Sequence, residues 1–159
     1  MKIKVGFGYD VHRLEEGYEF WLGGIKIAHS KGSVGHSDGD TLIHAICDAM
    51  LGAVNLRDIG NHFPDNDPSL RGIDSKILLK KTNEIIKSKG YTIGNIDSTI
   101  CLQQPKIKPF IDEMQGTLSK VLQISTEDIS IKATTTEKLG FTGREEGVAA
   151  YAVVLLQKE

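Results

Sequence analysis

Residues 2–13, KIKVGFGYDVHR, combine an apolar, glycine-containing run with Asp10 and His12 two positions apart. The run predicts a β-strand with glycines near its end. Side chains of a strand alternate between its two faces, so Asp10 and His12 are expected to project from the same face. A carboxylate and an imidazole placed together in this way fit a salt bridge, a general acid–base pair or two thirds of a metal site.

The rest of the chain mixes strand and helix patterns. Residues 36–55 have apolar positions at helical spacing, with Ser37 as the expected N-cap and acidic residues in the first turn. Residues 56–72 and 138–147 resemble loops or turns. We expect further strands at 18–29 (a hairpin around Gly23-Gly24), 91–103, 129–136 and 148–158, and further helices at 74–90, ending at Gly90, and around 110–124. The pattern predicts an α+β fold, with helices packed on one face of a mixed β-sheet.

The chain has 159 residues, of which 40% are hydrophobic and 25% are charged. This length and composition predict one globular domain that spans residues 1–159. The formal net charge of −2 gives no electrostatic footprint for nucleic acid or a membrane surface. The apolar stretches are only strand-length, and the N-terminus lacks the apolar core of a secretion signal. Cys47 and Cys101 show no CxxC spacing, which favours two buried free thiols in a reducing cytoplasm over a disulfide.

His44 is the third candidate for a cluster with Asp10 and His12. It falls on the helix predicted at 36–55, with Asp40 and Asp48 one turn away on either side, where a carboxylate could orient its ring. Asp, His and His form a sound three-ligand set for zinc, with the fourth position left for water or substrate. From spacing alone, a salt-bridged surface histidine remains the alternative.

Other polar segments also allow two interpretations. His36 and Ser37 at a helix start could bind phosphate, or could be a simple cap and its neighbour. Asp58, Gly60 and Asp65 could close over a polar ligand, or could reflect turn chemistry. Thr134, Thr135, Thr136 and Glu137 could hold phosphate and a divalent cation, or could be a strand that runs into a capped turn.

Two further segments are equally open on spacing alone. Lys106 and Lys108, beside two prolines, could frame a nucleotide or could form an ordinary solvated connection. Phe141, Arg144 and Glu146 could form a polar patch or a surface turn.

Four motifs in order make a more specific pattern than any one of them. They are G-x-D-V-H at 8–12, H-S-D-G-D at 36–40 with His44, D-I-G-x-x-F-P-D at 58–65, and K-A-T-T-T-E-K-L-G-F-T-G-R at 132–144. With G-Y-T-I-G-N-I-D at 90–97 and the Pro-Lys at 105–106, the chain closely resembles the 2-C-methyl-D-erythritol 2,4-cyclodiphosphate synthase family of the non-mevalonate isoprenoid pathway. The resemblance covers essentially the whole chain.

The resemblance implies roles for individual residues. Asp10, His12 and His44 match zinc ligands, with a substrate phosphate oxygen as the fourth ligand. Glu137 matches the residue that helps to hold a second divalent cation, magnesium or manganese. His36 and Thr135 match positions that stabilise the transition state.

The substrate contacts implied by the resemblance form two groups, and each is spread over several segments. The methylerythritol and phosphate positions are Ser37, Asp58, Gly60, Phe63 and Asp65. The cytidine and phosphate positions are Lys106, Thr134, Thr136 and the backbone of residues 102–108, where the side chains around the Pro-Lys depart from the family pattern. Asp10, His12, His36, Thr135, Glu137, Phe141 and Arg144 complete the predicted substrate-binding set.

The family reaction is an intramolecular phosphoryl transfer. The 2-phosphate of 4-diphosphocytidyl-2-C-methyl-D-erythritol 2-phosphate attacks the β-phosphorus, and CMP leaves. The family also implies a homotrimer, with active sites between neighbouring subunits. Two other interpretations of the residues remain: a zinc hydrolase that uses metal-bound water, and a nucleotide- or metal-binding module with structural zinc.

Overall fold

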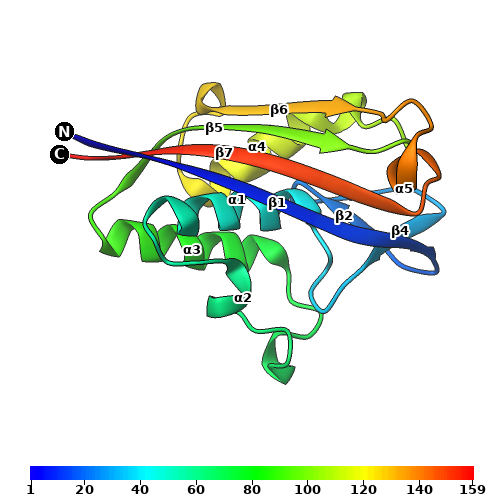
Figure 1. The fold of residues 1–159 in the computed structure, drawn as a ribbon, viewed down its shortest axis with the longest axis horizontal. Coiled ribbons are helices and arrows are strands. Elements are labelled where there is room, and N and C mark those ends of the chain that lie inside the picture. Colours follow the sequence, from blue (N-terminus) through cyan, green and yellow to red (C-terminus); the bar gives the residue numbers. More distant parts are fainter.

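The computed structural model describes all residues, 1–159, as a five-stranded mixed sheet with helices beside it (Figure 1). The sheet order is β4-β1-β7-β5-β6, in which β5 and β6 run parallel and the other neighbours run antiparallel. Its strands are β1 (Lys2–Glu16), β4 (Lys31–Val34), β5 (Thr92–Cys101), β6 (Ile129–Thr134) and β7 (Gly147–Lys158). A separate two-stranded sheet pairs β2 (Phe20–Leu22) with β3 (Ile25–Ile27) around the predicted Gly23-Gly24 turn.

Three longer helices cover one face of the large sheet, as predicted. They are α1 (Thr41–Ala53), α3 (Ser75–Ser88) and α4 (Ile111–Leu122). Helix α1 packs against β1 and β7, α4 packs against β6, and α3 lies against α1 and α4 (Figure 1). The α+β class with a mixed sheet is therefore confirmed.

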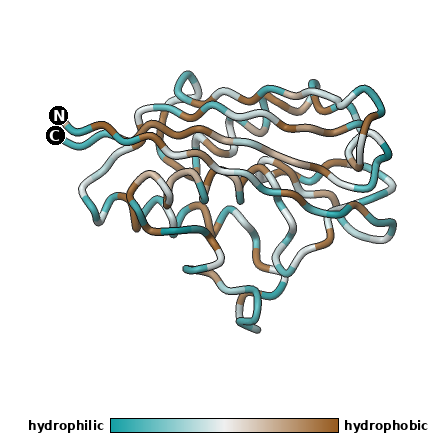
Figure 2. Tube along the Cα trace, in the orientation of Figure 1, coloured by the Kyte–Doolittle hydropathy of each residue, from teal (hydrophilic) through white to brown (hydrophobic).

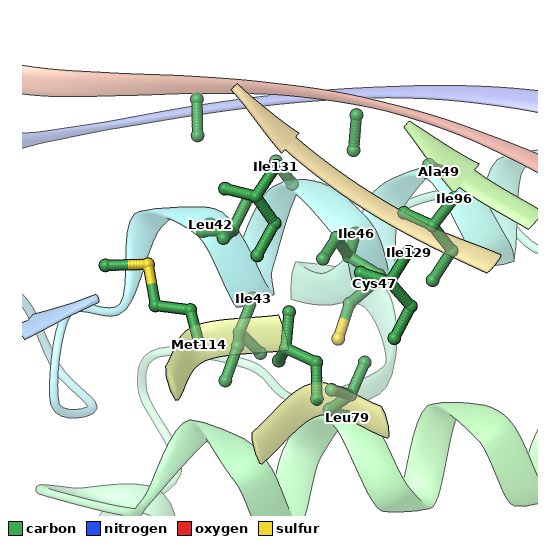
Figure 3. Close-up of a cluster of buried hydrophobic side chains, with 14 of the residues drawn as sticks. Leu42, Ile43, Ile46, Cys47, Ala49, Leu79, Ile96, Met114, Ile129 and Ile131 are labelled. Atoms are coloured by element: carbon green, nitrogen blue, oxygen red, sulfur yellow. The ribbon is translucent and has the colours of Figure 1, made fainter. Parts of the chain in front are cut away.

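The hydrophobic core lies between this sheet and the helices. Figure 3 shows Leu42, Ile43 and Ile46 of α1 meeting Leu79, Met114 and isoleucines of β5 and β6. All three α1 residues have no exposed surface, which fits a helix at the centre of a core. Figure 2 shows hydrophobic residues concentrated along the strands and adjacent helices, and a more hydrophilic chain in the lowest loop of the view.

The start of α1 differs from the prediction. Asp40, not Ser37, is the N-cap, because the Asp40 carboxylate accepts the Ile43 N–H at 3.0 Å. The same carboxylate accepts the N–H groups of Gly23 and Gly24, so it joins the β2–β3 turn to α1. Consequently the first turn of α1 contains no acidic residue, and Ser37 lies in the turn before the helix.

Several connections contain short elements that the sequence patterns missed. The segment 56–72 includes α2 (Ile59–His62) and η1 (Pro68–Leu70), and the predicted turn at 138–147 includes α5 (Gly140–Gly143). Two more one-turn elements are η2 (Lys108–Phe110) and η3 (Thr126–Asp128). Strand β1 also runs three residues beyond position 13, where it pairs with the unpredicted strand β4.

Both cysteines are free thiols, as predicted, but only Cys47 is fully buried. Burial raises the pKa of Cys47 to about 12, while Cys101 at the end of β5 is half-buried. No helix in the structure has the length and hydropathy needed to cross a membrane.

Candidate metal centre and its pockets

Asp10, His12 and His44 converge as the sequence predicted. Asp10 and His12 occupy even positions of β1, the face that turns toward α1, and His44 comes from α1 itself. Asp10 Oδ2 lies 3.0 Å from His12 Nδ1 and 3.1 Å from His44 Nδ1. One ligand atom from each of the three side chains lies within 4.8 Å of the others, which fits a single metal ion.

Two glycines of β1 allow this convergence. A Cβ at Gly6 would lie 1.8 Å from the Ala49 carbonyl oxygen, and a Cβ at Gly8 would lie 1.9 Å from that of Ala45. Any side chain there would push α1 away from the strand. The glycines in the opening motif therefore bring His44, which precedes Ala45, close to Asp10.

Electrostatics keep the carboxylate available as a ligand. Burial raises the pKa of Asp10, but hydrogen bonds and positive charge from His12 and His44 outweigh burial and hold this pKa below its usual range. Burial lowers the pKa of His44, but the hydrogen bond and charge of Asp10, with smaller contributions from Asp40 and Asp38, raise it above its usual value. The cluster is thus an anion flanked by two imidazoles, a donor set typical of zinc.

The carboxylates expected to orient His44 do not contact its ring. Asp40 serves as the helix cap described above, and Asp48 Oδ1 accepts the Ile59 N–H at 2.7 Å. The second ring nitrogen of His44, Nε2, instead lies 2.9 Å from Ser75 Oγ and 3.2 Å from Ser37 Oγ. Ser75 was missed from the sequence, because an Asp-Ser pair at the start of α3 indicates only a helix cap.

A pocket of about 480 Å³ lies over the triad. It is lined by the three cluster residues and by five other predicted site residues: His36, Ser37, Gly60, Phe63 and Asp65. His36 Nε2 lies 2.9 Å from the carbonyl oxygen of Asp67, which accepts a hydrogen bond from the ring. Asp58 is the one predicted residue of this segment outside the lining, because its side chain caps α2 by accepting the Asn61 N–H.

A second, smaller pocket of about 210 Å³ contains Lys106, Thr134 and Thr135. It lies between the 102–108 segment and the end of β6, and it shares no lining residue with the triad pocket. Thr136 and Glu137 follow in the adjoining turn, where the Thr136 hydroxyl donates to the Leu139 carbonyl at 2.7 Å. Glu137 is exposed, and no cluster in the structure joins it to the triad.

Phe141 and Arg144 line neither of these two pockets. Arg144 Nε donates to Glu146 Oε1 at 2.8 Å on the surface, and this hydrogen bond and charge raise the pKa of Arg144. The ring of Phe141 lies against Gly147, where β7 begins. The structure therefore places these two residues outside the lining of both pockets, next to the turn that holds Thr136 and Glu137.

Comparisons with known proteins identify relatives over the whole chain. The chain matches the YgbB family model over residues 3–157. It is 66% identical over 158 residues to the 2-C-methyl-D-erythritol 2,4-cyclodiphosphate synthase of Bacteroides fragilis, and the match covers 99% of both chains.

Two solved structures extend this similarity to three dimensions. The bifunctional IspDF of Campylobacter jejuni gives a TM-score of 0.95 at 40% identity, covering 99% of this chain and 43% of that longer one. The CDP complex of Plasmodium falciparum IspF gives a TM-score of 0.86 at 37% identity, covering 99% of this chain and 97% of that one.

The chain therefore belongs to the YgbB family. Its similarity to cyclodiphosphate synthases, at 65–66% identity, extends over nearly the whole chain. The protein is therefore a lyase that forms 2-C-methyl-D-erythritol 2,4-cyclodiphosphate in the MEP (non-mevalonate) isoprenoid pathway.

Proposed function

We propose that the triad pocket binds 4-diphosphocytidyl-2-C-methyl-D-erythritol 2-phosphate and closes it to the cyclic diphosphate. An oxygen of the 2-phosphate attacks the β-phosphorus, and the bond from that phosphorus to the departing CMP breaks. The observation that carries the proposal is the convergence of Asp10, His12 and His44 beneath a pocket of about 480 Å³. Holding both reacting groups in one bound molecule gives the advantage of an intramolecular reaction.

Asp10, His12 and His44 are proposed to hold zinc, with the fourth position left for a substrate phosphate oxygen. The ion would neutralise phosphate oxygens and polarise the phosphorus under attack. Glu137 is proposed to help hold a second cation, Mg²⁺ or Mn²⁺, on the diphosphate, because an exposed carboxylate suits a hard cation.

The other residues of the triad pocket are proposed to position the substrate. His36 is held by the Asp67 carbonyl at the pocket wall, where it can contact the phosphoryl group being transferred. Thr135, which lines the smaller pocket, is proposed to stabilise the transition state together with His36. Ser37 lies between the His44 ring and the open pocket. The methylerythritol portion and its phosphates are assigned to Ser37, Asp58, Gly60, Phe63 and Asp65.

The smaller pocket is proposed to take the cytidine end. Lys106 supplies a cation for phosphate, Thr134 and Thr136 supply hydroxyls, and the backbone of residues 102–108 frames the base. The CDP bound to the Plasmodium falciparum relative supports a cytidine nucleotide as the ligand. Phe141 and Arg144 are assigned a peripheral contact with the substrate.

The separation of the two pockets supports a homotrimer with active sites between subunits. The sheet face opposite the helices exposes a row of apolar side chains, among which Phe7 and Tyr9 both lie near the Tyr151 ring. A row of exposed apolar side chains on one sheet face is typical of a protein interface. Its members are Ile3, Val5, Phe7, Tyr9, Val11, Tyr151 and Val153.

We further assign residues 1–159 to one cyclodiphosphate synthase domain in the cytoplasm. A single cluster of buried hydrophobic residues runs from β1 to β7 and supports one domain. The two free thiols are consistent with a reducing compartment.

Phosphorus NMR of the products tests the proposed reaction directly. Purified protein incubated with Zn²⁺, Mg²⁺ and the cytidyl substrate should give CMP and a cyclic diphosphate in equal amounts. A linear bisphosphate would instead assign the pocket to a zinc hydrolase. Nucleotide binding without turnover would indicate that the protein is a binding module and not an enzyme.

A further inference from the structure

The two ring nitrogens of His44 have different partners. Nδ1 faces Asp10 in the metal cluster, and Nε2 faces the hydroxyl of Ser75 at 2.9 Å. Ser75 is the first residue of α3 and has no exposed surface, while His44 is 9% exposed. The contact is thus a buried link between α3 and the metal-binding helix α1.

The direction of the hydrogen bonds in this link is fixed by Asp38. The carboxylate of Asp38 receives both the backbone N–H and the hydroxyl of Ser75. An ionised carboxylate can only accept hydrogen bonds, so the single hydroxyl hydrogen of Ser75 is committed to Asp38. Ser75 Oγ is left to act as an acceptor toward His44.

It follows that the His44 ring carries a proton on Nε2, because Ser75 Oγ can only accept in this link. A neutral imidazole carries a proton on one nitrogen and a lone pair on the other. With Nε2–H held by Ser75, Nδ1 becomes the ligand atom when a metal ion replaces the proton that Nδ1 shares with Asp10. This is the tautomer that a metal ion at the cluster requires, and a hydrogen bond from the second nitrogen is the usual way to fix it.

We propose that Ser75 and Asp38 are positioning residues that hold His44 as its Nε2–H tautomer and so present Nδ1 to the metal. The inference rests on the metal site proposed above and adds two residues to it. Neither residue touches the ligand atoms of the cluster. They act through His44.

The carboxylate that sets the direction is itself held firmly. The backbone N–H of Asp38 donates to the Ile73 carbonyl at 3.1 Å, and its side chain also accepts the Asp40 N–H at 3.1 Å. The Gly72 N–H donates to the His36 carbonyl at 2.7 Å. The turn before α1 is therefore tied to the turn before α3, and the chain Asp38–Ser75–His44 runs across that junction.

Ser37 is a weaker partner of the same nitrogen. Its Oγ lies 3.2 Å from His44 Nε2 and accepts the Gly39 N–H, but no carboxylate accepts its hydroxyl hydrogen. Ser37 also lines the open pocket, whereas Ser75 does not. Of the two serines, only Ser75 has its hydroxyl hydrogen committed to a carboxylate, so only Ser75 must act as an acceptor toward His44.

Zinc affinity measured by chelator competition tests the proposal without relying on turnover. We expect Ser75→Ala to weaken zinc binding by about 10- to 100-fold, the usual cost of losing a partner behind a metal-bound histidine. The visible spectrum of the Co²⁺-loaded variant should change as well, because His44 is no longer held in one orientation. Ser98→Ala is the matched control, since Ser98 is also a buried serine with one hydroxyl bond, to the Ser130 carbonyl at 2.8 Å, in β5.

A second variant, Asp38→Asn, keeps the test valid if Ser75→Ala does not fold. An amide at this position can donate to Ser75 and so free its hydroxyl to donate to His44, which favours the wrong tautomer. Asp38→Asn is expected to weaken zinc binding too. In the Ser75→Ala background it should weaken zinc binding little further, because the two residues act in series.

The possible results separate this inference from the metal site on which it rests. If the unmodified protein binds no zinc, the proposed metal site is wrong. If the unmodified protein binds zinc and folded Ser75→Ala or Asp38→Asn binds it equally well with the same Co²⁺ spectrum, the positioning role is wrong. Zinc binding that weakens as much in Ser98→Ala as in Ser75→Ala would also overturn that role.

Discussion

The triad pocket and the smaller pocket at residues 102–108 and 133–135 are built in opposite ways. The triad comes from a strand and a helix pressed together at Gly6 and Gly8, and its ligand atoms already lie close to one another. The second pocket is smaller, and its hydroxyls, those of Thr134 and Thr135, lie at the exposed end of β6 and in the turn that follows. The comparison indicates that the core fixes the metal-binding half within one chain. Under the proposed function the smaller pocket is the nucleotide-binding half, and substrate, a cation and a neighbouring subunit would complete it.

The largest loss of activity is expected from removing one of the three predicted metal ligands. His44→Ala should abolish CMP release, because two remaining ligands bind zinc weakly, while circular dichroism and the oligomeric mass stay unchanged. Activity and fold are measured on the same preparation. An unfolded variant would make His44 a structural residue, and full activity would remove the triad from the mechanism.

The next effect tests whether the strand–helix approach builds the site. Gly8→Ala should lower the free energy of unfolding by about 3 kcal/mol, at the upper end of the cost of overpacking. Its Cβ would lie 1.9 Å from a carbonyl oxygen of α1. Denaturant unfolding measures the loss, and zinc affinity should fall with it.

Gly116→Ala in α4 is the control for this change. A Cβ at Gly116 meets nothing within 4 Å, so alanine should stabilise the helix by about 0.5–1 kcal/mol. Equal unfolding energies for the two variants would contradict the role given to the close approach.

A smaller effect is expected in the second pocket. Lys106→Ala should raise the KM for the cytidyl substrate about tenfold, the loss of one hydrogen bond to a charged group. Zinc affinity should remain that of the unmodified protein, because the two pockets share no residue. A parallel loss of zinc binding would show that the two halves are not independent.

The smallest effect is expected at the periphery. Arg144→Ala should raise KM less than about threefold, since an exposed ion pair already occupies the guanidinium and such groups contribute little. Steady-state kinetics beside Lys106→Ala measure the difference. A larger rise in KM for Arg144→Ala than for Lys106→Ala would show that Arg144 contacts the substrate directly and strongly.

Local sequence patterns predicted much of the fold and of the metal centre. The alternation of β1 placed Asp10 and His12 on one face, and the helical period placed His44 on a helix. The start of that helix was predicted wrongly because Ser37 and Asp40 are both good caps. Only the packing of the β2–β3 turn against Asp40 decides between them.

Local sequence patterns could not predict contacts between segments that are distant in the chain. The bond between Ser75 and His44 joins residues 31 positions apart on two helices. No spacing rule indicates it, because it depends on how α3 packs on α1. The short elements α2 and α5 were missed for a different reason: one helical turn leaves too brief a period to recognise.

The cap at Asp40 also bears on where a phosphate could bind near α1. The carboxylate sits on the positive end of the α1 dipole, and Thr41, Leu42 and Ile43 behind it have no exposed surface. The backbone N–H groups at the start of that helix are therefore not available to bind a phosphate. The pocket wall holds Asp10 and Asp65 beside His12, His36 and His44, so a divalent cation at the triad would add to the positive charge that meets a phosphorylated anion. Substrate binding should therefore strengthen as divalent ions are supplied, so metal loading would affect substrate affinity as well as chemistry.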